Sequence, residues 1–315
     1  MALHLPGSGP LPPAALEVSR PSFSYLRAED YRVARVGFRI GLAGRDLCPR
    51  LYPMTGLLLH HLGEYAESDR PEVAVTYRLN RGPAVLAVVE HSPAAQAGLV
   101  AGDVLLNSNG IPFASGRLPD QDPMRERQSI EAIERQFEES LTGGSVRLTI
   151  LRDGDERQLV LNPIPGCPAR VRLARSTQFN AFANRGYAIM TTALLNFVKN
   201  DDELAIVLGH EIAHNILNHP QSLNAEGVPP RGLLRQFGKN ASRVKQTEIE
   251  ADRLGLRLAW AAGYDLTAAA PFWRRYSARV GPRFATTHPG LKAREKIIAE
   301  TIAELGSSQS GAQRP

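Results

Sequence analysis

The sequence contains little cysteine, little lysine and no long apolar run. Its two cysteines, Cys48 and Cys167, form no C-x-x-C pattern, which excludes the usual cysteine-rich zinc and redox motifs. They fit one disulfide in an oxidising compartment or two buried thiols equally well. No segment approaches the roughly 18 consecutive apolar residues of a membrane-spanning helix, so we expect no transmembrane segment. Only five of the 37 basic residues are lysine, and the arginines form no basic stripe, which argues against nucleic-acid binding.

A length of 315 residues is that of about two domains. The first 22 residues are rich in proline and glycine, and they lack the basic start and the continuous apolar core of a signal peptide. We expect a disordered leader over residues 1–22 and a disordered tail over residues 306–315. The leucine-rich segment from Thr55 to Tyr65 is predicted to be a helix.

The next segment, residues 72–164, has the pattern of a small β-rich domain. One helix is predicted inside it, because Ile130, Ile133, Phe137 and Leu141 recur at spacings of three or four. The Asp153-Gly154 pair predicts a tight hairpin turn. The predicted strands are Val73–Leu79, Ala84–Val89, Val104–Asn107, Val146–Leu151 and Gln158–Leu161.

This segment resembles a bacterial-type PDZ domain, on the run from His91 to Leu99, the following Gly102-Asp103 and the Asn109-Gly110 turn. The resemblance implies that a peptide adds as an extra strand. We expect it beside Ala84–Val89, held by the loop Asn80–Pro83. Because proline has no N–H to donate, a domain that only orients its neighbour is the alternative.

The chemistry-bearing residues lie in the second half, on a helix predicted from Asp202 to Asn218 and ended by Pro220. It contains His210-Glu211-Ile212-Ala213-His214, the H-E-x-x-H pattern. Four residues make about one helical turn, so His210 and His214 can direct ring nitrogens at one ion. Neutral imidazole is a favoured zinc ligand, and Glu211 is placed to take a proton from water.

A catalytic zinc site needs a third protein ligand, and Glu248 provides one, 34 residues after His214. Glu248 and Asp252 lie four residues apart on one helix face, so Glu248 can bind the ion while Asp252 orients a ligand histidine. Glu250 points elsewhere, and we expect it to be solvated. The cofactor predicted from these residues is one Zn²⁺ per chain.

Residues 165–305 resemble the zinc metallopeptidases of the HtpX and CAAX prenyl protease family, which couple H-E-x-x-H to a later E-x-x-x-D. The resemblance implies an α+β chain: a mainly helical zincin-type peptidase domain with a small edge sheet, preceded by the β-rich PDZ-like domain. It also implies a substrate-binding segment and a strand at the edge of the cleft that pairs with substrate. The residues concerned are Asn180, Ala181 and Phe182 in the segment and Gly186, Tyr187 and Ala188 at the start of the strand.

The segment Thr287-His288-Pro289, with Arg294 after it, resembles a late motif of the same family. His288 is expected to stabilise the oxyanion or to occupy the open metal position and hold the enzyme latent, and Arg294 to lie behind the ligands. His219 falls one residue too early for the third histidine of a metzincin, so we reject it as a ligand. The polar interval between Pro220 and Thr247 predicts a mobile loop beside the cleft.

These inferences lead to a zinc endopeptidase that acts on extended or unfolded polypeptides, in a periplasm or cell envelope or alternatively in the cytoplasm. A latent peptidase acting as a peptide-binding or chaperone-like module, and a structural zinc protein, are the competing hypotheses. The expected parts are the leader, a segment 23–71 that packs on the peptidase domain, a PDZ-like domain 72–164, a peptidase domain 165–305 and the tail.

Overall fold

The computed structural model describes residues 23–113, 123–184, 186–229, 238–281 and 289–309. The predicted leader, residues 1–22, and His288 lie outside these ranges. Within them, no helix is long and apolar enough to cross a membrane. The helices are α1 (Phe23–Ala43), α2 (Arg70–Thr76), α3 (Pro93–Gln96), α4 (Pro123–Leu141), α5 (Thr192–Leu195), α6 (Asp201–Ile216), α7 (His219–Ala225), α8 (Gly238–Ala261), α9 (Ala269–Val280) and α11 (Leu291–Gln309).

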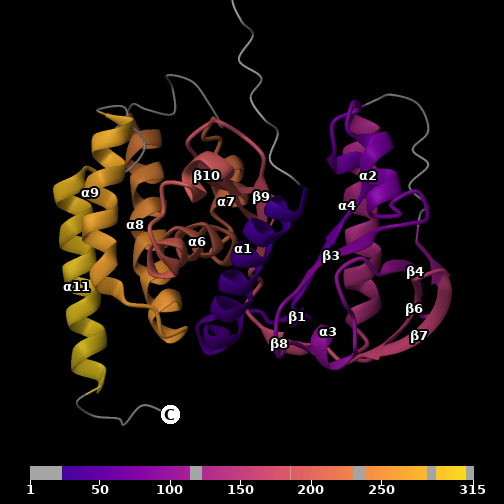
Figure 1. The fold of residues 1–315 in the computed structure, drawn as a ribbon. Helices are drawn as coiled ribbons and strands as arrows, with labels where there is room; N and C mark the ends of the chain where they lie inside the picture. Colours follow the sequence, from indigo (N-terminus) through magenta and orange to yellow (C-terminus); the bar gives the residue numbers. More distant parts are fainter. Residues whose placement is uncertain (1–22, 114–122, 185, 230–237, 282–288, 310–315) are drawn as a thin grey trace, which may run out of the picture.

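The chain folds into a β-rich half and a mainly helical half, which lie on opposite sides of α1 in Figure 1. The predicted α+β fold class is therefore confirmed. The strands are β1 (Tyr52–Met54), β2 (Leu57–His60), β3 (Ala84–Val88), β4 (Val104–Ser108), β5 (Ile111–Pro112), β6 (Val146–Arg152), β7 (Asp155–Leu161), β8 (Ile164–Gly166), β9 (Arg170–Ala174), β10 (Ala181–Asn184) and β11 (Tyr187–Thr191).

The β-rich half is built on an antiparallel sheet with the strand order β2-β3-β4-β6-β7, in which β5 also pairs with β4. The predicted helix around Phe137 forms as α4 and buries its apolar face against the sheet. The Asp153-Gly154 turn joins β6 to β7 with both residues at positive φ, 54° and 97°, as a type I′ hairpin requires.

Two predicted elements in this half have the wrong type. Thr55–Tyr65 is not a helix, because Leu57–His60 forms strand β2 and pairs with β3. A short run of leucines has no clear period, so sheet pairing decided its conformation. Val73–Leu79 is not a strand: Arg70-Pro71 begins a helix, and Val73 and Tyr77, one turn apart, are buried while Val75 is exposed.

The sheet also changes where a peptide could bind. Strand β3 lies between β2, which pairs with it from Ala84 to Val88, and β4, which pairs with it at Ala84, so neither edge is open along the whole of Ala84–Val89 as predicted. Among the described strands, β2 is at one edge of this sheet and β7 is at the other. Since β2 covers Leu57–His60, this sheet includes a strand that precedes residue 72, the predicted start of the PDZ-like domain.

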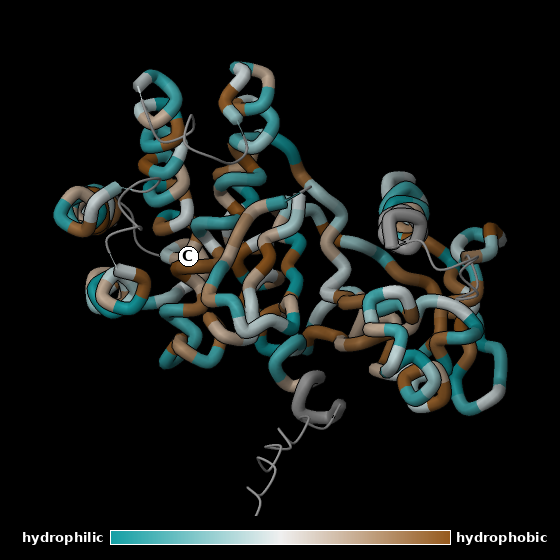
Figure 2. The backbone as a smooth tube through the Cα atoms, turned by 90° about the horizontal axis from the view of Figure 1, so that it is seen from above, coloured by the Kyte–Doolittle hydropathy of each residue, from teal (hydrophilic) through white to brown (hydrophobic). Residues whose placement is uncertain are grey.

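The helical half contains a small sheet with the order β10-β11-β9, in which β11 runs parallel to β9 and antiparallel to β10. Helix α1 packs against β9, α6 and α8, and its residues Val36 and Ile40 are buried in the same core as Leu204 and Leu208 of α6. In Figure 2, hydrophobic segments gather inside both halves, and hydrophilic segments are frequent on the surrounding helices.

A disulfide joins Cys48 and Cys167, so one of the two states considered for the cysteines is present. It links the segment after α1 to the chain between β8 and β9, across 119 residues of sequence. Together with the pairing of β1 with β8, it ties the N-terminal helix to the start of the small sheet.

Candidate metal centre

Helix α6 carries the H-E-x-x-H residues through the middle of the helical core. Asn200 caps its start by accepting a hydrogen bond from the Glu203 N–H at 3.0 Å, and three acidic residues follow in the first turn, where the helix dipole favours negative charge. From Glu203 to Ala213 every residue is buried. A helix buried on all sides holds its histidines in a fixed place.

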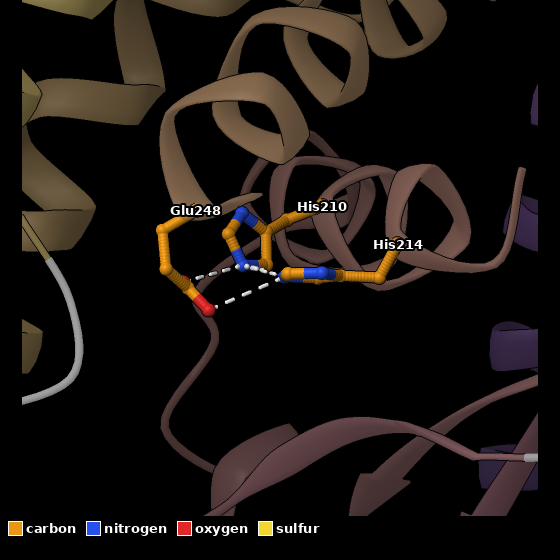
Figure 3. A group of neighbouring side chains, drawn as sticks. All are labelled: His210, His214 and Glu248. Atoms are coloured by element: carbon orange, nitrogen blue, oxygen red, sulfur yellow. Dashed lines mark hydrogen bonds and ion pairs between the residues drawn. The ribbon is translucent and has the colours of Figure 1, made fainter. Parts of the chain in front are cut away.

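Three side chains from α6 and α8 converge on one point, as Figure 3 shows. The Nε2 atoms of His210 and His214 lie 3.1 Å apart. Glu248 of α8 places Oε2 3.3 Å from His210 Nε2 and Oε1 3.5 Å from His214 Nε2. Neighbouring ligands of a tetrahedral ion with bonds of about 2.0 to 2.1 Å lie about 3.3 to 3.4 Å apart. The three groups therefore have both the spacing and the donor types of a zinc site.

His210 is oriented from behind by a buried carboxylate. Asp252 Oδ1 lies 2.8 Å from His210 Nδ1, and Arg294 donates from Nε to the other Asp252 oxygen at 2.7 Å. Arg294 is fully buried and stacks over the ring of Trp273, 3.9 Å from its centroid. A hydrogen on His210 Nδ1 leaves the lone pair on Nε2, the atom that faces Glu248 and His214.

The surroundings of His210 favour positive charge. Burial by itself lowers the pKa of this imidazole, but the carboxylates of Asp252 and Glu248 outweigh burial and raise the pKa to about 10. Arg294 and His210 in turn hold the pKa of Asp252 below its usual value, although burial opposes this. An environment that stabilises the positively charged, protonated imidazole also stabilises a metal cation.

His214 is contacted from behind by a residue that the sequence reasoning set aside. His219 Nδ1 lies 2.9 Å from His214 Nδ1, and His219 Nε2 lies 3.0 Å from Glu250 Oε2. His219 faces the nitrogen of His214 that points away from Glu248, which agrees with its rejection as a ligand. Glu250 is not simply solvated, because it bonds to this buried histidine.

An interruption of the helix between α6 and α7 produces this contact. Helix α6 ends at Ile216, Asn218 takes a left-handed conformation with φ 56°, and Pro220 lies in the first turn of α7 instead of only ending α6. In a continuous helix, residues 214 and 219 would point about 140° apart. The signal in the sequence was an asparagine, tolerant of this conformation, placed two residues before a proline.

A cavity of about 400 Å³ opens beside the three ligands. Glu211 lines it together with His210 and His214, and so do Ala181, Phe182 and Ala183 of β10. Strand β10 pairs with β11, and none of the other described strands pairs with its second edge. The cavity thus brings together an acid–base side chain, a set of metal-ligand atoms and an open strand edge.

The predicted substrate-binding residues lie in different places in the structure, and only some of them border the cavity. Ala181 and Phe182 border the cavity, and Asn180, next to them, bonds through its backbone to Thr191. The strand that begins at Tyr187 is not the edge of the cleft as predicted, because β11 is the central strand and both its edges are paired. Ala188 is buried in the core, and Gly186 is in the turn between β10 and β11.

The structure also differs from two further predictions, the mobile loop and the disordered tail. The interval Pro220–Thr247 is not a simple loop, because α7 covers residues 219–225 and α8 begins at Gly238, while residues 230–237 lie outside the described part. The tail is helical as far as Gln309, since α11 continues past Gly306.

Comparison with known proteins gives matches to curated proteins, to solved structures and to one family model. The mitochondrial metalloendopeptidase OMA1 of Schizosaccharomyces pombe is 32% identical over 148 residues, covering 40% of this chain and 44% of that protein. OMA1 of Arabidopsis thaliana is 31% identical over 144 residues, with coverages of 38% and 29%. The β-barrel assembly-enhancing protease of Escherichia coli K12 is 28% identical over 156 residues, with coverages of 39% and 32%.

The chain spans less than half the length of these curated relatives. Among solved structures, the HtrA3 PDZ domain bound to a phage-derived ligand matches 37% of this chain and 89% of its own, with 19% identity and a TM-score of 0.26. The family model of peptidase family M48 matches residues 162–229 and 228–302. Residues 162–302, which carry the ligand cluster, are therefore similar to peptidase family M48.

Proposed function

We propose that this chain is a zinc-dependent endopeptidase that hydrolyses extended or unfolded polypeptides. The observation that carries the proposal is the convergence of His210, His214 and Glu248 at 3.1 to 3.5 Å, in a cavity that Glu211 also lines. The M48 match and the metalloendopeptidase relatives support the same reading. The one Zn²⁺ per chain is part of this proposal.

His210, His214 and Glu248 would hold the ion. A zinc ion, when bound, supplies positive charge that makes water a better nucleophile and polarises a carbonyl group. Glu211, next to His210 on the helix, accepts the proton from the attacking water. The same carboxyl then gives that proton to the leaving amine, which completes hydrolysis of the peptide bond.

The substrate backbone would lie along the edge of β10 that none of the other described strands pairs with. An extended peptide there forms strand-like hydrogen bonds with the main chain of Ala181–Asn184, so recognition depends on backbone more than on side chains. This favours unfolded segments, because a folded protein has already paired its own backbone. Phe182, 38% exposed at the cavity, offers an apolar contact to a substrate side chain.

The β-rich half would bind peptide or regulate the peptidase through strand β2. A cavity of about 120 Å³ lies between β2, α4 and β9 and is lined by apolar side chains that include Leu57 and Phe137. Arg172 of β9 donates to the Leu59 carbonyl of β2 at 2.8 Å and forms an ion pair with Glu134 of α4. A peptide added to β2 would compete with Arg172 for the Leu59 carbonyl, and β9 belongs to the same sheet as β10.

We place the protein in protein quality control in a periplasm or cell envelope. The Cys48–Cys167 disulfide supports an oxidising compartment, and one relative is named a β-barrel assembly-enhancing protease. Mass spectrometry of protein isolated from its native compartment, alkylated without reduction, tests this. Two alkylated cysteines would contradict the placement.

The function itself is tested by the cleavage of an unfolded protein with the zinc-loaded chain and its Glu211→Gln variant. We expect the variant to bind zinc as wild type does and to cleave about 100- to 10,000-fold more slowly. Glu67→Gln, at an exposed position of the β-rich half, is the control and should cleave at the wild-type rate. Equal cleavage by wild type and Glu211→Gln would reject Glu211 as the base. If neither cleaves although both bind zinc, the latent, peptide-binding alternative takes precedence.

A further inference from the structure

The two ligand histidines differ in the group that contacts their Nδ1 atom. His210 meets a carboxylate directly, with Asp252 at 2.8 Å from its Nδ1. His214 meets a second imidazole, with His219 Nδ1 2.9 Å from its Nδ1, and only then a carboxylate, Glu250, 3.0 Å from His219 Nε2. His219 is almost fully buried, with 3% of its side chain exposed.

Only one placement of hydrogens satisfies this row of atoms when His214 binds a metal. Ligation through Nε2 requires a lone pair there, so the hydrogen of His214 is on Nδ1. His214 Nδ1–H then donates to the lone pair of His219 Nδ1. A neutral His219 has its hydrogen on Nε2, from which it donates to the Glu250 carboxylate, an acceptor in every orientation.

The break at Asn218 makes this arrangement specific to the fold. Because α6 ends before His219, that residue is carried back beside His214 instead of pointing away from it. Glu250 reaches His219 from α8, the helix that also carries Glu248. One helix therefore supplies both a ligand of the site and the last acceptor behind another ligand.

We propose that His219 and Glu250 are a positioning pair for His214, fixing its tautomer and ring orientation for metal binding. The inference rests on the proposed zinc site, and it assigns a role to two residues outside the ligand set. Carboxylates and other partners behind ligand histidines usually contribute about 10- to 100-fold to metal affinity. The pair acts through His214 and takes no part in the chemical step.

Substitutions at His219 separate this role from others. His219→Ala removes the acceptor for His214 and should weaken zinc binding about 10- to 100-fold. His219→Gln offers an amide oxygen to His214 and an amide N–H to Glu250, so it should restore most of the affinity. Glu250→Ala should weaken binding in the same direction. His91→Gln, at an exposed histidine, and Glu67→Ala are the matched controls and should leave affinity unchanged.

The readouts are the zinc dissociation constant from competition with a chelator, the visible spectrum of the Co²⁺-loaded protein, and the melting temperature of the metal-free protein. The proposal expects weaker zinc binding by His219→Ala with a Co²⁺ spectrum that keeps its coordination number. A change of coordination number in both His219→Ala and His219→Gln would make His219 a ligand and overturn the proposal. Unchanged zinc affinity with a lowered melting temperature would leave His219 a packing residue and also overturn it.

Failure of the proposed function has a different signature. If wild type binds no zinc, the zinc site itself is rejected. If wild type binds zinc and His219→Ala binds it equally well, only the positioning pair is rejected.

Discussion

Gly209 of α6 and Gly255 of α8 are in backbone contact. A Cβ atom built on Gly255 would lie 2.7 Å from the carbonyl carbon of Gly209 and 2.7 Å from the backbone nitrogen of His210. Glu248 lies seven residues before Gly255, about two helical turns, and therefore on the same face of α8. The contact between the two glycines thus sets the distance between the helices that carry the candidate ligands.

Gly255→Ala should lower both stability and metal affinity. Alanine favours a helix over glycine by about 1 kcal/mol, but here the added carbon meets backbone, which cannot rotate away. Overpacking of this kind costs about 1 to 3 kcal/mol, so we expect a net loss of unfolding free energy. The separation of α6 from α8 should also weaken zinc binding. Chemical unfolding and chelator competition measure the two effects.

The matched control is Gly306→Ala in α11, where an added Cβ meets nothing within 4 Å. Helix propensity then acts alone, and the variant should be as stable as wild type or slightly more stable. Equal behaviour of the two alanine variants would contradict the role given to the glycine contact.

Asp252→Asn should weaken zinc binding about 10- to 100-fold. The carboxylate accepts from His210 Nδ1, whereas an amide can donate to that nitrogen and so favour the tautomer that cannot bind through Nε2. The amide also removes the negative charge that pairs with the buried Arg294. Chelator competition measures the affinity, with Asp46→Asn, 94% exposed, as the control. Affinity like that of wild type would show that Asp252 does not orient His210.

Leu57→Glu should block the proposed peptide groove of the β-rich half. Leu57 is only half-buried and lines the cavity between β2 and α4, so a charge there disfavours an apolar peptide without removing a core residue. Titration with a fluorescent peptide of apolar residues should show at least a tenfold loss of affinity. Ile111→Glu, at an exposed position of β5 in the same sheet, should bind as wild type does. Equal binding by both variants would place any peptide site elsewhere.

Asp30 predicts a specific pH dependence of stability. Burial raises the pKa of Asp30 from 3.8 to about 6, although Arg175 and Arg172 lower it. The folded protein therefore keeps this proton at pH values where the unfolded chain has lost it. The resulting stabilisation is complete below pH 4 and is lost as the pH rises from about 4 to about 6.

Asp30→Asn removes this titration. The unfolding free energy of wild type, relative to the variant, should fall by about 1 to 3 kcal/mol between pH 4 and pH 7. Urea unfolding of both proteins at four pH values measures the difference. Parallel pH profiles for wild type and variant would reject the raised pKa.

Local sequence patterns predicted much of the β-rich half but not its edge. Strands β4, β6 and β7, helix α4 and the Asp153-Gly154 hairpin follow from alternation, helical spacing and turn residues. Strand β2 does not, because Leu57–His60 becomes a strand only by pairing with β3. As a result, one edge strand among the described residues is β2, whereas β3, beside which the peptide was predicted, lies between two strands.

The candidate metal centre was likewise predicted only in part from local sequence patterns. The spacing of His210 and His214 on one helix, and of Glu248 and Asp252 on another, is a property of the sequence, because helical geometry alone puts each pair on one face. That the two faces meet depends on the close approach of α6 and α8, a contact between residues 46 positions apart in sequence, Gly209 and Gly255. Only the folded chain decides such a distance.

The sequence by itself therefore determined which residues can bind a metal and which can move a proton. Tertiary structure decided which other side chains contact and orient these residues. The left-handed turn at Asn218 brings His219 against His214, and α8 brings Glu250 against His219. Periodic patterns describe one element at a time, whereas the orientation of a ligand depends on side chains from several elements, which meet only when the core is packed.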